Sequence, residues 1–132
     1  MKLLSAVCSD RGIKKKINQD SLLVRSAMTK EGEILLAAVC DGMGGLEKGE
    51  VASGEVIRAL ARWFEETLPL LLSGEQEKKG LGERRKRVIA KSLEILIQEE
   101  NQMISVYGKE KNLLLGTTVS AVLLIAGCYL IV

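Results

Sequence analysis

Residues 34–45 read Ile-Leu-Leu-Ala-Ala-Val-Cys-Asp-Gly-Met-Gly-Gly, and this stretch decides the fold. Seven apolar residues end on Asp41, and three of the next four residues are glycines. A short apolar run that is closed by glycines predicts a buried strand. An acid at the end of such a strand is costly to bury unless a cation or hydrogen-bond donors compensate its charge. Because glycines let the main chain turn sharply toward a ligand, Asp41 and Gly42 predict a site for a hard cation.

The chain around this stretch is expected to be rich in strands at both ends and helical in the middle. Strands are expected over residues 3–8, 20–28, 33–41, 117–126 and 128–132. Apolar residues recur at spacings of three and four from Val51 to Leu68, which predicts a helix. Pro69 is its expected end, although residues 70–72 can prolong it. A second helix is expected over 83–107, with Gly108 as its stop signal.

The last twenty residues, 113–132, carry no charge and leave two interpretations open. Their length is sufficient for a transmembrane helix that would serve as a tail anchor. Their β-branched residues and glycines instead favour two strands joined by a turn at Ala126-Gly127, which is the interpretation we prefer. The whole chain is therefore expected to be one α+β domain.

The composition excludes several classes of function. With 47 % apolar and 27 % charged residues, the 132-residue chain is expected to be globular, and its net charge of +2 gives no reason to expect nucleic-acid binding. The chain has no histidine, which excludes His-ligated zinc, Ser-His-Asp triads and Cys-His dyads. Cys8, Cys40 and Cys128 lie in apolar stretches and are interpreted as buried free thiols in a reducing compartment, the cytoplasm.

The glycine-rich segment after Asp41 does not match the common nucleotide-binding loops. Glu50 stands where the Walker spacing requires lysine, and Glu47 stands where the dinucleotide fingerprint requires a third glycine. The plain alternative is a strand-to-helix turn in which the glycines only permit the geometry.

Two other motifs accompany the Asp41 stretch along the chain. Residues 18–20 read Asn-Gln-Asp, three residues after Lys15, and residues 116–118 read Gly-Thr-Thr at the start of an expected strand. In this order the motifs resemble the metal-dependent protein phosphatase (PPM) family, the type 2C serine/threonine phosphatases, and especially its bacterial-type members. The resemblance is strongest at residues 41–45 and at Gly-Glu-Val-Ala-Ser, 49–53. Residues 1–132 match the N-terminal half of the family's domain.

The resemblance implies a fold, a metal centre and roles for five residues. The fold is a four-layer α/β/β/α sandwich of two antiparallel sheets flanked by helices, which would be incomplete here. Asp41 would be the catalytic carboxylate that bridges two Mn²⁺ or Mg²⁺ ions, and the Gly42 carbonyl would be a further metal ligand. The metals would activate a water that attacks phosphorus. Lys15 replaces the usual phosphate-binding arginine and loses its bidentate geometry, while Gln19 and Asp20 would hold metal-bound water.

The implied activity is hydrolysis of phosphoserine and phosphothreonine on phosphoproteins in the cytoplasm, opposite a cognate serine/threonine kinase. The family's other metal-binding aspartates are not matched in this sequence, so weak metal binding and little turnover are expected from this chain alone. Lys15 and Gln19 also motivate a second interpretation, a non-catalytic binding or regulatory module with the phosphatase fold. The third is the tail-anchored protein, whereas the first two require neither membrane nor nucleic acid.

Overall fold

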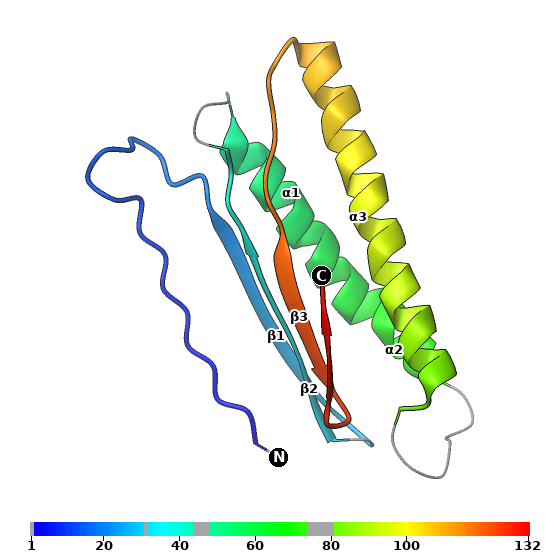
Figure 1. Ribbon diagram of the computed structural model, residues 1–132. Coiled ribbons are helices and arrows are strands. Elements are labelled where there is room, and N and C mark those ends of the chain that lie inside the picture. Colours follow the sequence, from blue (N-terminus) through cyan, green and yellow to red (C-terminus); the bar gives the residue numbers. More distant parts are fainter. Residues whose placement is uncertain (1, 31, 44–47, 74–80) are drawn as a thin grey trace.

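The computed structural model describes residues 2–30, 32–43, 48–73 and 81–132. Its elements, in chain order, are β1 (Ser21–Thr29), β2 (Gly32–Cys40), α1 (Gly49–Arg62), the π-helical turn η1 (Trp63–Thr67), α2 (Leu68–Leu72), α3 (Glu83–Lys111), β3 (Ser120–Ile125) and β4 (Cys128–Ile131). The strands form one antiparallel sheet in the order β1-β2-β3-β4 (Figure 1). Helix α1 packs against β1 and β2, and α3 packs against α1 and α2. The α+β class is therefore confirmed for one four-stranded sheet with helices.

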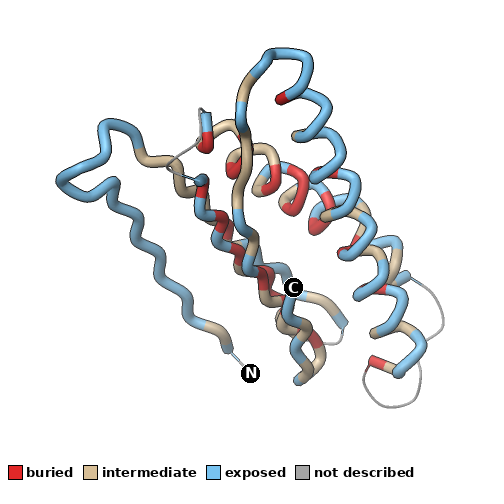
Figure 2. The backbone as a smooth tube through the Cα atoms, turned by 45° about the horizontal axis from the view of Figure 1, so that its top comes forward, coloured by how far each residue is buried: buried red, intermediate tan, exposed pale blue. Residues whose placement is uncertain are grey.

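The core lies between the sheet and the helices (Figure 2). Side chains of a strand alternate between the two faces of its sheet, so every second residue of β2 faces the helices. Leu36 lies at the centre of this face, is fully buried, and pairs in register with Leu123 of β3. At the other side of the core, Trp63 is buried and donates a hydrogen bond from Nε1 to Ser92 Oγ at 2.8 Å, which joins η1 to α3.

The first helical region continues through Pro69 to Leu72, so the expected end at Pro69 is wrong and the prolonged alternative is confirmed. The reason lies in η1, where the N–H of Leu68 reaches back to the carbonyl of Trp63, one residue further than in an α-helix. Pro69 follows directly on this wider turn. The ordinary hydrogen-bond ladder is already interrupted there, so the missing N–H of proline costs little.

The second helix runs past Gly108 to Lys111, so Gly108 is not its stop signal. The helix ends on Asn112, which adopts a left-handed conformation with φ 52°, a role that asparagine shares with glycine. Gly108 is instead required by a close approach of the chain. The N–H of Leu113 donates to the Gly108 carbonyl at 2.9 Å, and a Cβ on Gly108 would lie 2.9 Å from the carbonyl oxygen of Leu113. The glycine lets the chain fold back closely onto the helix.

The expected strand over residues 3–8 is also wrong, because residues 2–9 contain no strand. The segment is extended and runs separately from β1 (Figure 1). An extended apolar sequence becomes a strand only when another strand supplies the hydrogen-bonding partners, and none of the described strands pairs with it.

The C-terminal residues form the predicted β-hairpin. Strands β3 and β4 pair directly, and Ala126 and Gly127 form the turn between them with φ 50° and 74°. Two positive φ values are typical of the tight turns that match the twist of a hairpin. Residues 120–131 therefore contradict the tail-anchor helix, and no helix in the described parts of the chain is long and apolar enough to cross a membrane.

The three cysteines are free, but only one is fully buried. Cys40 is buried on the helix side of β2, and burial raises the pKa of its thiol to about 11. Cys128 is half-buried, whereas Cys8 is exposed in the N-terminal segment, so the expectation of a buried thiol is wrong for Cys8. The reason is the same missing strand, because an extended segment that pairs with none of the described strands leaves the Cys8 side chain in solvent.

One carboxylate lies inside the helical layer. Glu100 of α3 is 5 % exposed, and its Oε2 has no hydrogen-bond partner among the described residues. Burial raises the pKa of this carboxyl and the negative charges of Glu55 and Glu99 act in the same direction, while Arg62 and Arg58 oppose them. The folded chain therefore binds this proton more tightly than the unfolded chain does.

Neutralising Glu100 is expected to stabilise the protein, and the gain in stability over the parent chain should be larger at alkaline pH than at acidic pH. The folded-state pKa is raised, so the folded chain holds this proton more tightly than the unfolded chain and loses stability as pH rises above the ordinary glutamate pKa. Glu100→Gln should therefore increase the free energy of unfolding by roughly 1 kcal/mol at pH 8 and by little at pH 4. Urea unfolding at the two pH values measures this difference. Glu66→Gln, which removes the same charge from an exposed position, is the control and should give no pH-dependent gain.

Candidate functional site

Three segments that are far apart in the sequence meet at the end of the sheet where α1 begins (Figure 1). The N–H of Gly42 donates to the carbonyl of Gln19 at 3.2 Å, and the N–H of Met43 donates to the carbonyl of Gly116 at 3.1 Å. Gly42 also forms an isolated β-bridge with Thr117. The structure thus brings together the three motifs at residues 18–20, 41–43 and 116–118.

Gly42 lies where two main-chain segments approach too closely for a side chain. A Cβ on Gly42 would overlap the carbonyl oxygen of Gln19 and lie 2.7 Å from the carbonyl oxygen of Gly49. A Cβ on Gly49 would in turn lie 3.0 Å from the carbonyl carbon of Gly42. Because both positions are glycine, the main chain at the end of β2 can lie in direct contact with the main chain just before β1 and at the start of α1.

Asp41 directly follows β2, and its backbone is held on both sides by Thr118. The N–H of Asp41 donates to Thr118 Oγ1 at 3.2 Å, and its carbonyl accepts the N–H of Thr118 at 3.0 Å. The residue itself is exposed. Burial therefore does not force a cation onto this carboxylate, contrary to the expectation from the sequence, since water can solvate it at the end of the sheet.

Gln19 and Asp20 lie next to this junction. The backbone N–H of Asp20 donates to Asn18 Oδ1 at 3.1 Å, and its own Oδ1 is buried without a hydrogen-bond partner in the described parts of the chain. The side-chain amide of Gln19 donates to Glu50 Oε2 over a long 3.4 Å. An acceptor without a donor in such a place is suited to a ligand or a water molecule.

Sequence reasoning missed two residues of this site, Glu50 and Ser53. Both belong to the 49–53 motif, but the sequence assigns neither a role in the site; Glu50 lies in the first turn of α1 and accepts a hydrogen bond from the Gln19 amide. Ser53 is fully buried, donates from Oγ to the carbonyl of Gln19 at 2.6 Å and lies 3.0 Å from Ser21 Oγ. The Gln19 carbonyl thus accepts both Ser53 and Gly42, so one oxygen fixes α1, β1 and β2 together. A polar residue inside an otherwise apolar helical stripe was the available signal.

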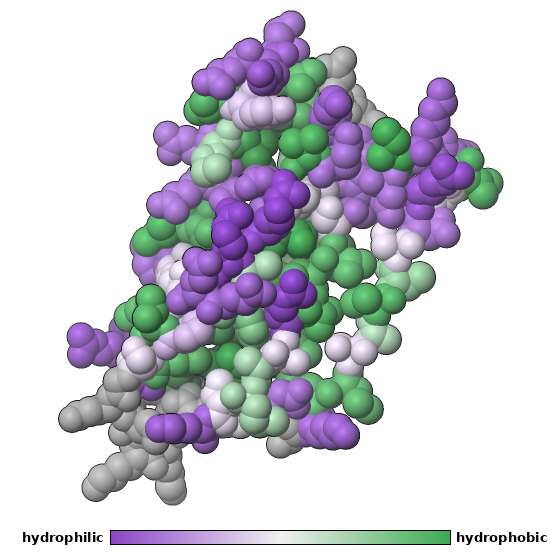
Figure 3. Space-filling view, turned by 180° about the vertical axis from the view of Figure 1, so that it is seen from behind, coloured by the Kyte–Doolittle hydropathy of each residue, from purple (hydrophilic) through white to green (hydrophobic). Residues whose placement is uncertain are grey.

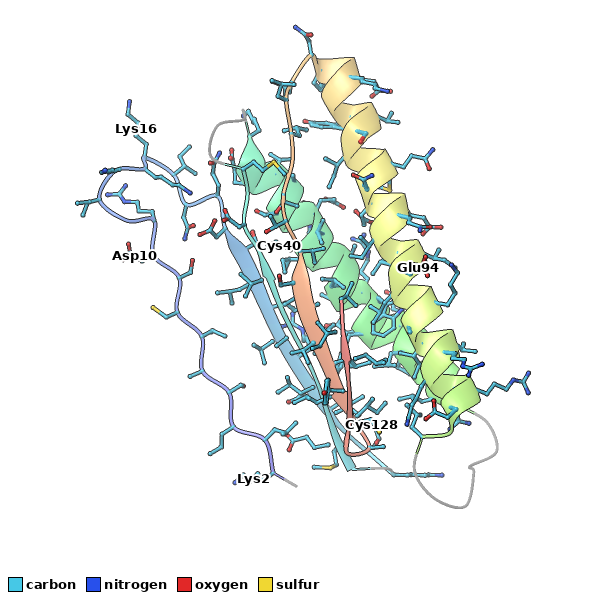
Figure 4. The ribbon with its side chains drawn as sticks, viewed as in Figure 1. Lys2, Asp10, Lys16, Cys40, Glu94 and Cys128 are labelled. Atoms are coloured by element: carbon cyan, nitrogen blue, oxygen red, sulfur yellow. The ribbon has the colours of Figure 1, made fainter. Side chains whose placement is uncertain are left out.

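Lys15 lies in an exposed loop, residues 10–16, outside this junction. The loop is shaped locally, because Asp10 Oδ1 accepts the N–H of Gly12 at 2.6 Å and Arg11 Nη1 donates to the carbonyl of Lys16 at 3.2 Å. Figure 4 shows Lys16 at the tip of this loop, pointing away from the sheet. Among the described residues, no hydrogen bond or ion pair joins Lys15 to Asp41 or Gly42.

The described residues contain no group of three or more Cys, Asp or Glu side chains arranged to hold a metal ion. The candidate donors at this end of the sheet are the Asp41 carboxylate, the Gly42 carbonyl and the Oδ1 of Asp20, which has no hydrogen-bond partner in the described parts of the chain. Oxygen donors of this kind suit a hydrated Mg²⁺ or Mn²⁺ ion, which retains several waters and needs few protein ligands. Gly44 and Gly45 lie outside the described residues.

In the described parts of the chain these oxygen atoms do not assemble a metal cage. Comparison of the chain with models of known protein families, with curated proteins and with solved structures gave no match.

Proposed function

We propose that this chain forms the Asp41-containing part of a metal-dependent serine/threonine protein phosphatase of the PPM type. The observation that supports the proposal is the junction of three separated motifs. Asp41 is 77 residues from Thr118 in the chain, yet their backbones are hydrogen-bonded, and Gly42 is bonded to Gln19 at the same end of the sheet. The ladders of β1, β2 and β3 bring these segments together, and what supports the proposal is that an acid, a close-packed glycine and a polar motif all lie at this one end of the sheet.

In the proposed function Asp41 would be the catalytic carboxylate, and Asp41 and Gly42 would hold Mn²⁺ or Mg²⁺. Such ions lower the pKa of a bound water and neutralise the charge of a phosphate group. The chain's own residues position this chemistry: Thr118 fixes the backbone of Asp41 through two hydrogen bonds. The Oδ1 of Asp20, which lacks a hydrogen-bond partner among the described residues, would accept a hydrogen bond from metal-bound water, and the Gln19 amide donates to Glu50. Lys15, in the exposed loop, would be the phosphate-binding cation.

The substrate class, phosphoserine and phosphothreonine on proteins, and a cognate kinase follow from the resemblance and are part of the proposal. So is a cytoplasmic location. The four-layer sandwich would need a second sheet on the face of the sheet that the helices leave open.

A second candidate is the non-catalytic binding module with the same fold. It is favoured by one specific observation, that the Asp41 carboxylate is exposed while the amide of Gln19 is bonded to Glu50. Both features weaken a metal centre. Asp41-dependent metal binding would support the phosphatase, and its absence would support the non-catalytic module.

Titration with Mn²⁺ is expected to show weak binding that depends on Asp41. With a carboxylate and a main-chain oxygen as the protein ligands, a dissociation constant on the order of 1 mM is expected, because water fills the remaining positions. Asp41→Ala should weaken binding at least roughly tenfold, and Asp20→Asn should weaken it by a smaller factor. Isothermal titration calorimetry measures both.

Glu66→Ala is the matched control, since it removes one exposed carboxylate outside the junction and should leave Mn²⁺ affinity unchanged. Hydrolysis of an aryl phosphate with excess Mn²⁺ should be barely above that of metal alone. Strong turnover that is lost in Asp41→Ala would contradict the expected weakness of this chain but support the phosphatase. Mn²⁺ binding that is absent, or equal in Asp41→Ala, would exclude Asp41 as a metal ligand.

A further inference from the structure

The exposed loop, residues 10–16, concentrates positive charge at one end of the molecule. It contains Arg11 and three consecutive lysines, residues 14–16, against one acid, Asp10, so these four cations and one anion give it a net charge of +3. The whole chain carries +2, so all its other residues together carry −1. Every residue of the loop is exposed, and in the described parts of the chain no ion pair engages its lysines. Their charges are therefore available to a partner.

An apolar side chain lies within this positive charge. Ile13 is 102 % exposed, so the fold buries none of its surface, and Ile17, which follows the loop, is 58 % exposed. A single exposed apolar residue is common on a protein surface and needs no explanation by itself. Ile13, however, stands between Arg11 and the three lysines. Figure 3 shows hydrophobic side chains among the hydrophilic ones on the part of the surface where this loop projects.

Hydrogen bonds within the loop give it a defined turn. Gly12, with φ 71°, donates its N–H to Asp10 Oδ1 at 2.6 Å, and Arg11 Nη1 donates to the carbonyl of Lys16 at 3.2 Å. Ile13 lies between these two contacts along the chain. The loop projects beyond the start of β1, away from the helices (Figure 1). The turn thus presents Ile13 together with the neighbouring cations.

We propose that the exposed loop docks on the surface of an anionic phospholipid bilayer, where Ile13 enters the interface and the lysines meet the head-group phosphates. A lysine can lay its aliphatic stem along apolar surface and keep its ammonium group among the head groups. A nucleic acid or an acidic protein segment would engage the cations but leave Ile13 in water. A bilayer interface accepts both the charge and the apolar side chain, and such paired signals hold a protein on a membrane without a spanning helix.

The proposal does not depend on metal binding at Asp41. Lys15 has a role in the proposed phosphatase, so it stays unchanged in every variant of the test. Arg11 also stays unchanged, because its side chain closes the loop onto the Lys16 carbonyl. The variants therefore replace Ile13, Lys14 and Lys16, and the vesicle assay contains no Mn²⁺, so its outcome is independent of the candidate site.

Co-sedimentation of the full chain with lipid vesicles is expected to show weak, charge-dependent binding. With roughly 30 % phosphatidylserine in phosphatidylcholine, half of the protein should be bound at accessible lipid on the order of 1 mM. Vesicles of phosphatidylcholine alone should bind roughly tenfold less or weaker still, because the head-group attraction is then absent. About 0.5 M NaCl should have a similar effect, since salt screens exposed charges.

The loop variants should weaken this binding by different terms. The double variant Lys14→Gln/Lys16→Gln should lower the affinity roughly 25-fold, since each lysine near an anionic surface contributes about fivefold. Ile13→Ser should lower it roughly tenfold, because the apolar side chain no longer enters the interface. The complete exposure of Ile13 means that its replacement removes no packing within the fold. Far-UV circular dichroism checks that each variant is folded.

The matched controls make the same changes on α3. Lys109→Gln/Lys111→Gln removes two charges from exposed positions, and Val106→Ser replaces an exposed apolar residue. Both should bind the vesicles within roughly twofold of the parent chain. Equal losses in the loop variants and their controls would overturn the proposal, because net charge or hydrophobicity, and not this loop, would then determine binding.

Two other results would also overturn it. The first is no binding of the parent chain to phosphatidylserine vesicles. The second is binding that Ile13→Ser leaves unchanged and that a single-stranded oligonucleotide reproduces at equal affinity, which would assign the loop to polyanions in general. Ile13→Trp provides a direct readout of insertion: its fluorescence should shift to shorter wavelength with phosphatidylserine vesicles and not with the oligonucleotide, while the buried Trp63 gives a constant background.

Discussion

Gly42→Ala is expected to lower the free energy of unfolding by about 3 kcal/mol. The new methyl group would overlap the carbonyl oxygen of Gln19 and lie 2.7 Å from that of Gly49. Both oxygens belong to the main chain and cannot rotate away as a flexible side chain can. Relief therefore requires that the end of β2 move away from α1 and β1, which breaks the hydrogen bond between Gly42 and Gln19.

Urea unfolding measures the effect, and Gly54→Ala is the matched control. Within 4 Å, a Cβ on Gly54 would meet only the guanidinium group of Arg58, at 3.4 Å or more, and Gly54 lies inside α1. Alanine is preferred to glycine in a helix, so Gly54→Ala should raise the free energy of unfolding by roughly 0.5–1 kcal/mol. Equal unfolding midpoints for Gly42→Ala and the parent chain would mean that the close approach at this junction is not required. Mn²⁺ affinity should fall along with stability in Gly42→Ala and remain unchanged in Gly54→Ala.

Leu36→Ala is expected to cost about 3 kcal/mol of stability. Leu36 is fully buried at the centre of the helix-facing side of β2, and its neighbour in register, Leu123, is also buried. Truncation removes apolar contacts and leaves a cavity that the strands cannot close, because hydrogen bonds hold β2 to a strand on each side. The loss should appear as a lower urea midpoint with little change in the slope of the transition.

Leu70→Ala provides the same chemical change at an exposed position of α2, where the side chain is 72 % exposed. Its cost should stay below about 0.5 kcal/mol. Similar losses for the two variants would contradict the assignment of the core to the space between the sheet and the helices.

Much of the secondary structure follows from local sequence patterns. The apolar run before Asp41 predicted β2, and Ala126-Gly127 predicted the β3–β4 hairpin. Such signals are local, since period, glycine and turn chemistry act over a few residues. The errors at residues 3–8, Pro69 and Gly108 have a common origin. Each depends on a partner or a neighbouring turn that a single-segment pattern does not contain: a pairing strand, the wider turn of η1, or the returning chain at Leu113.

The candidate site also combines residues that the sequence marked and contacts that only the tertiary structure shows. Local composition marked Asp41 and Gly42 at the end of an expected strand, whereas Gln19 and Asp20 were named only through the family resemblance. Only the tertiary structure decided that Thr118 holds Asp41, that Ser53 and Gly42 share the Gln19 carbonyl, and that Lys15 lies in a separate exposed loop. It also decided that Asp41 is exposed and that one sheet face is left open. The physical reason is that hydrogen bonds across tens of residues and the exposure of a side chain depend on how whole elements pack, and a linear pattern does not specify that packing.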